Sequence, residues 1–102
     1  MTDRELLELA AKAAGIEFSE IGGGARYAPQ PGIMQPYVPW NPLTDDGDAL
    51  RLAVKLEITI MFDSYSVWCG HHGAVKHHNG DPCAATRLVI VRAAAEIGKR
   101  MK

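Results

Sequence analysis

The chain has 102 residues, the size of one domain, so we expect a single domain over residues 1–102. Its net charge of −1 lacks the basic surplus that neutralises phosphates, which argues against a nucleic-acid binder. No apolar run approaches the ~20 residues of a membrane span, and residues 1–15 do not read as a signal peptide. We therefore expect a cytoplasmic protein without a membrane partner.

The N-terminal residues predict a first helix. Thr2 and Glu5 have the spacing of a capping box, which starts the helix at Asp3. Gly15 is typical of the left-handed residue that ends a helix. The apolar spacing predicts a buried stripe formed by Leu6, Leu9, Ala10 and Ala13.

Residues 16–28 predict a β-hairpin. Apolar and polar residues alternate over 16–21, and three glycines at 22–24 allow a tight reversal into a second strand at 25–28. A phosphate-binding loop would instead need a helix directly after the glycines. The chain runs into Pro29 and Pro31, which favours the hairpin.

Five of the six prolines lie between residues 29 and 42, which predicts an extended loop rather than a central strand. Its large apolar side chains have two alternatives: they fold back over the core, or they form an exposed recognition loop. The candidate binding residues in this loop are Met34, Tyr37 and Trp40. We expect Trp40 to pack inward, which makes Tyr37 the better probe of binding.

A second helix is predicted from about residue 45 to 56. Thr44 or Asp45 serves as its N-cap, and three aspartates at 45, 46 and 48 suit the positive end of the helix dipole. The same aspartates lack the glycine and glutamate positions of a calcium loop. The predicted buried face consists of Leu43, Leu50 and Val54, with Leu52 and Leu56 beside it.

This stretch also carries a family resemblance. Trp40, Pro42, Thr44 and Asp45, followed by Ala-Val-Lys-Leu at 53–56, resemble a pattern in small uncharacterised proteins of tailed temperate phages and prophages. The first and last helices of the chain fit that group too. The resemblance implies a phage or prophage origin and an approximate helical scaffold, and it implies no activity.

Alternating residues 57–63 predict a central strand, with Ile58, Ile60 and Phe62 on its core face. After a turn near 63–64, residues 65–69 are expected to pair back, and residues 74–77 add an edge strand. Asp81 and Pro82 then predict the N-cap and first position of a last helix.

The last helix is expected to run to about Met101, with Leu88, Val91 and Ile97 buried. Its alanines allow close approach to a neighbouring helix. The fold class that follows is α+β, with an antiparallel sheet of three or four short strands packed with three helices.

All four histidines and both cysteines fall within residues 69–83, which makes this segment the candidate metal site. The spacing fits no standard zinc finger, and adjacent histidines on extended backbone point in opposite directions. The alternative is a polar hairpin tip with the two cysteines as small core residues. We predict no stoichiometric zinc and no cofactor. The candidate ligands are Cys69, His71, His72, His77, His78 and Cys83.

The sequence contains no complete catalytic motif, because no third group orients a Cys–His or Ser–His pair. We therefore expect a non-enzymatic accessory protein that binds another protein of the host or the phage. A small metal-binding protein and a small hydrolase-like enzyme are the alternatives, and self-association stays open. The proline loop is the favoured binding surface, and a sheet edge with Tyr65 and Trp68 is the second candidate.

Overall fold

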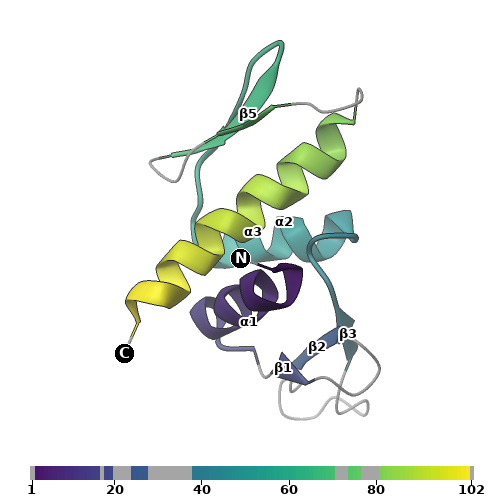
Figure 1. Cartoon of the computed structure of the whole chain (residues 1–102), viewed down its shortest axis with the longest axis vertical. Helices are drawn as coiled ribbons and strands as arrows, with labels where there is room; N and C mark the ends of the chain where they lie inside the picture. Colours follow the sequence, from purple (N-terminus) through teal and green to yellow (C-terminus); the bar gives the residue numbers. More distant parts are fainter. Residues whose placement is uncertain are drawn as a thin grey trace.

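A computed structural model of the chain describes residues 2–16, 18–19, 24–27, 38–70, 74–76 and 81–101. Three helices lie in this part of the chain: α1 (Asp3–Ala14), α2 (Asp46–Lys55) and α3 (Pro82–Arg100). The described strands are β1 (Phe18–Ser19), β2 (Gly24–Tyr27), β3 (Val38–Trp40), β4 (Ile60–Phe62), β5 (Ser66–Cys69) and β6 (Ala74–Lys76). The predicted α+β class with three helices is confirmed (Figure 1).

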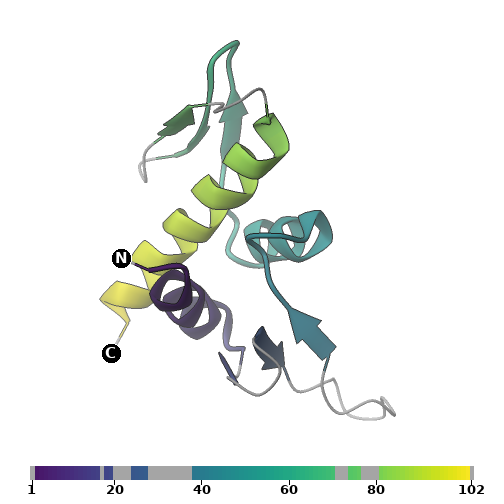
Figure 2. The same ribbon diagram turned by 45° about the vertical axis from the view of Figure 1, so that its right-hand side comes forward.

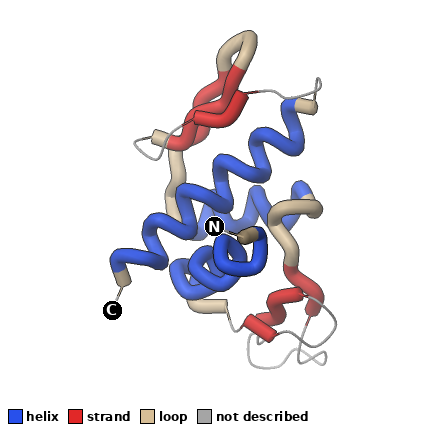
Figure 3. Tube along the Cα trace, viewed as in Figure 1, coloured by secondary structure: helices blue, strands red, loops and turns tan. Residues whose placement is uncertain are grey.

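The described strands form two antiparallel sheets rather than the single sheet that the sequence predicts. One has the order β1-β2-β3 and the other β4-β5-β6. The sheets lie at opposite ends of the molecule with the helices between them (Figure 3). Helix α2 occupies the chain between β3 of one sheet and β4 of the other.

Residues 38–40 form a strand, which corrects the prediction of a loop. This strand, β3, pairs with β2, and Arg26 lies opposite Pro39. A proline is tolerated there because β3 is an edge strand among the described residues, so one side of its backbone needs no partner. Trp40 is 3% exposed and belongs to the core, as expected.

Strand β4 is shorter than predicted and lies at a sheet edge, whereas β5 is central. Helix α2 ends with Glu57 at a φ of 54°, the left-handed region. There the Glu57 N–H donates to Val54 O and the Ile58 N–H to Ala53 O, which is the Schellman arrangement. Glu57 and Ile58 close the helix in this way, so they are not part of strand β4, which begins at Ile60.

The closest helix packing joins α1 to α3. A Cβ atom added at Gly98 would lie 2.0 Å from the carbonyl oxygen of Leu9, so the α3 backbone touches that of α1. Alanines are frequent among the buried residues of both helices, in line with the close approach that the sequence predicts. The buried residues of α1 are Leu6, Leu7, Ala10, Ala11 and Ala14, and those of α3 are Ala85, Val89, Ile90, Val91, Ala93, Ala94, Ala95 and Gly98.

Several predicted core faces are rotated in the structure. Leu9 and Ala13 are half-buried, as are Leu88 and Ile97, while Val91 is fully buried as expected. Helix α2 differs most, because Leu50 and Val54 are 60% and 69% exposed. Its core face consists instead of Asp48, Ala49, Leu52 and Ala53.

We predict that Gly98→Ala destabilises the fold, although alanine is the better helix former by about 1 kcal/mol. The new methyl group would overlap the Leu9 carbonyl, and overpacking of this kind costs about 1–3 kcal/mol. The thermal unfolding midpoint should fall by several degrees.

Gly47→Ala is the matched control in helix α2. A Cβ there would lie 3.2 Å from Asp45 Oδ2 and 3.3 Å from the Arg51 guanidinium, which are side-chain ends and not the backbone of another helix. This variant should keep or raise the midpoint. A midpoint unchanged by Gly98→Ala would show that the two helices do not approach as closely as described.

Candidate functional site

The hairpin formed by β4 and β5 concentrates the exposed large apolar side chains of the described residues. Met61, Phe62, Tyr65 and Trp68 are 51%, 64%, 81% and 43% exposed. We call these four residues the hairpin patch. The other exposed large apolar residues, Leu50, Val54 and Met101, lie on α2 and at the C-terminal end of α3.

The register of the hairpin assigns these side chains to two faces. Met61 lies opposite Trp68, so both share the outer face. Phe62 lies opposite Val67 on the other face, where Val67 and Cys69 are fully buried beneath α3. The turn of the hairpin projects past the helices (Figure 2). Phe62, one residue before the start of this turn, is therefore exposed on the face that the sequence assigned to the core.

Asp63 holds the turn through four hydrogen bonds to its carboxylate. Oδ1 accepts from the backbone N–H groups of Tyr65 and Ser66, both at 2.7 Å. Oδ2 accepts from the Ser66 hydroxyl at 2.9 Å and from the Trp68 indole Nε1–H at 3.0 Å. These bonds, with the Trp68 indole contributing most, hold the pKa of Asp63 well below its usual range.

The hydrogen bonds to Asp63 fix the orientation of Trp68 in the hairpin patch before any partner binds. The indole of Trp68 is fixed to the turn, and the Asp63 N–H donates to Ser66 O at 3.0 Å to close the hairpin. A side chain already held in one rotamer loses less conformational entropy on binding. This role of Asp63 was not predicted, although it has a known sequence signal. An aspartate in a turn commonly accepts hydrogen bonds from the backbone N–H groups two and three residues later.

The structure gives different results for the binding residues predicted in the proline segment and for those predicted in the hairpin. Trp40 is buried and does not form part of a described surface. Met34 and Tyr37 lie outside the described residues. Tyr65 and Trp68 are exposed on the same hairpin as Met61 and Phe62, which were not among the predicted binding residues. Met61 and Trp68 share one face and Phe62 lies on the other.

The predicted metal ligands lie mostly outside the described residues, including His71, His72, His77 and His78. Cys69 and Cys83 are both free thiols. Cys69 is fully buried, and burial raises its pKa to about 11, which disfavours the thiolate form that binds metals. Cys83 is exposed, which corrects its assignment to the core. The described residues contain no group of three or more potential metal ligands.

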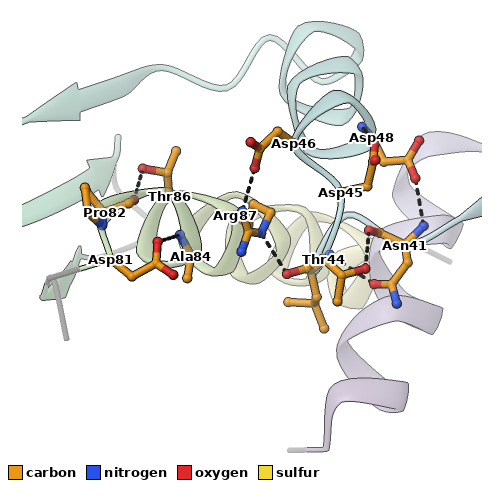
Figure 4. A network of polar contacts seen from close by, with 11 residues as sticks. Asn41, Thr44, Asp45, Asp46, Asp48, Asp81, Pro82, Ala84, Thr86 and Arg87 are labelled. Carbon is orange, nitrogen blue, oxygen red and sulfur yellow. Dashed lines mark hydrogen bonds and ion pairs between the residues drawn. The ribbon is translucent and has the colours of Figure 1, made fainter. Parts of the chain in front are cut away.

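The aspartates at the start of α2 are engaged within the protein (Figure 4). Asp45 is the N-cap and accepts from the Asp48 N–H at 2.8 Å. Asp48 is nearly buried, and its two oxygens accept from the Asn41 N–H at 2.9 Å and from Arg51 at 2.7 Å. Asp48 therefore joins the segment before α2 to the helix itself.

Arg87 links this region to α3. Its Nη1 lies 2.5 Å from Asp46 Oδ1, and its Nε donates to the carbonyl of Leu43 at 2.9 Å. Figure 4 shows the Arg87 side chain directed toward Asp46. Helix capping and helix–helix contacts thus account for the three aspartates, in agreement with the sequence analysis.

No protein-family model matches the chain, and no match to it was found among curated proteins or solved structures. The resemblance to phage and prophage proteins therefore stays a prediction. Among the described residues, no helix has both the length and the apolar character that crossing a membrane requires.

We predict that Asp63→Asn releases the Trp68 indole while keeping the turn. An asparagine Oδ1 can still accept from the Tyr65 and Ser66 N–H groups, whereas its NH₂ group cannot accept from the indole N–H. The indole proton of Trp68 should exchange with solvent faster in NMR spectra. The indole of buried Trp40 is the internal control, and equal exchange of Trp68 in both proteins would contradict the network.

The same network predicts an acid-resistant carboxylate. The folded pKa of Asp63 is below its unfolded value of about 3.9, so its stabilisation is complete above that value and is lost as the pH falls through the folded pKa. The side-chain carboxyl carbon of Asp63 should keep its ionised chemical shift from pH 6 down to about pH 3. A titration midpoint near 4 would show that the hydrogen bonds do not persist in solution.

Proposed function

We propose that this chain is a non-enzymatic accessory protein of a temperate phage or prophage and that it acts by binding another protein. The hairpin patch is the proposed binding surface. The observation that supports it is the gathering of four exposed large apolar side chains on one hairpin, with one of them held in place by Asp63. The phage origin rests on the sequence resemblance.

The residue types of the patch suit a protein interface. Tyrosine, tryptophan, phenylalanine and methionine are enriched at interface cores. The three aromatic residues bury a large area with few torsions to fix, and methionine adapts its shape to the partner. The patch also combines aromatic side chains with an indole whose polar N–H already has an acceptor. A partner can therefore cover the indole without leaving that N–H unpaired.

The hairpin replaces the proline segment as the favoured surface. Of the three proline-segment candidates, Trp40 belongs to the core, and the other two lie outside the described residues. The partner is a protein of the host or the phage with a complementary apolar surface.

Tyr65→Ala tests this proposal, because Tyr65 is the most exposed member of the patch. A tagged chain would be incubated with host lysate, the captured protein identified, and its affinity then measured with the purified partner. Loss of a central aromatic contact should weaken that affinity about tenfold or more. The thermal midpoint should stay unchanged, since the side chain contributes little to the core.

Leu50→Ala is the matched control, since it removes an exposed apolar side chain from α2, outside the patch. It should leave the affinity unchanged. Equal affinities for wild type and Tyr65→Ala would exclude the hairpin patch as the binding surface, as would an equal loss in both variants.

A further inference from the structure

Strand β4 lies at the open edge of its sheet among the described residues. Natural edge strands are protected by prolines, lysines or bulges that prevent another strand from pairing with them. Residues 60–62 are Ile-Met-Phe and contain neither a proline nor a charge. Their pairing with β5 is regular, without a bulge. At three residues the strand is short, which itself protects an edge, but it has none of the other protections, so among the described residues its edge is open to a further strand.

The hydrogen-bond pattern shows which backbone groups face outward from this edge. The Asp63 N–H bonds to Ser66 O, so Asp63 directs its backbone groups toward β5. Direction alternates along an antiparallel strand, so Met61 also faces β5. The N–H and C=O groups of Ile60 and Phe62 then point away from the sheet, two residues apart.

Two outward-facing residues with this spacing can form backbone hydrogen bonds with the same two residues of a second copy. If a second copy lies antiparallel about an axis at Met61, Ile60 of each copy meets Phe62 of the other as a hydrogen-bonded pair. Met61 then lies opposite its own counterpart on the outer face. Apolar side chains therefore meet on both faces of the extended sheet.

The charges of the segment also fit this register. The acidic residues nearest the strand are Glu57 and Asp63. Asp63 would lie opposite Thr59 of the second copy, whereas Glu57 closes α2 and lies outside the strand. No like charges come directly opposite one another, an arrangement that destabilises a sheet.

We propose that a second copy of this chain pairs with the β4 edge, so that two hairpins join into one six-stranded sheet. The exposed parts of Met61 and Phe62, with the strand edges, bury less area in the pair than the roughly 1,200–2,000 Å² of a stable interface. The dimer is accordingly weak and concentration-dependent. It goes beyond the proposed function, because it requires no other protein.

Met61→Lys and Met61→Glu test the register together. Each variant alone places like charges opposite each other at the axis, whereas an equimolar mixture places lysine opposite glutamate. Sedimentation velocity between about 10 µM and 1 mM should show dimers of the wild-type chain at the upper end. Each variant alone should associate about tenfold more weakly, and the mixture should recover the dimer.

Leu50→Lys and Leu50→Glu are the matched controls, because they introduce the same charges at an exposed site on α2. They should dimerise as the wild type does, and circular dichroism would verify that all four variants fold. A wild-type chain that stays monomeric would overturn the dimer. So would either Met61 variant alone associating as strongly as the wild type, or a mixture associating no more strongly than the variants alone. A monomer that still binds another protein through Tyr65 would refute the dimer and leave the proposed function standing.

Discussion

The backbone contact between α1 and α3 at Gly98 is the constraint on which the other packing depends. Because Gly98 has no side chain, α3 lies directly against the Leu9 carbonyl. Helix α3 then has its remaining surface available to α2 and to strands β5 and β6, which all pack on it. One long helix thus fixes both the helical core and the base of the hairpin. The hairpin patch is exposed at a defined place because that base is rigid.

The local signals in the sequence predicted the helix ends well. Thr2, Asp45 and Asp81 each cap a helix by accepting a backbone N–H three residues later, and Gly15 ends α1 in the left-handed conformation. Each of these features depends on a few adjacent residues. The end of α2 lies within one residue of the prediction, but Glu57, which was assigned to the next strand, instead adopts the positive φ that closes the helix. A charged residue in that conformation has no clear sequence signature.

The errors in the buried faces have a nonlocal cause. Hydropathy assigned Leu50 and Val54 to the core of α2, yet the helix turns Asp48 and its alanines inward. Asp48 is acceptable there because Asn41 and Arg51 hydrogen-bond its carboxylate. Arg87, distant in the sequence, anchors the start of the same helix. Since Asn41 and Arg87 lie outside α2, no periodicity within the helix reveals them.

The candidate site was predicted only in part, and the reason bears on how it works. Tyr65 and Trp68 were predicted as binding residues because they are aromatic and near a sheet edge. Phe62 was assigned to the core because, two residues from Ile60, it shares the face of that residue. Alternation identifies the face of a strand and does not show how far the covering helix extends. Phe62 is on the covered face yet exposed, next to a turn that Asp63 holds through four hydrogen bonds. A fixed turn carrying exposed aromatic side chains reduces the entropy cost of association, and this favours recognition over packing as the role of the hairpin.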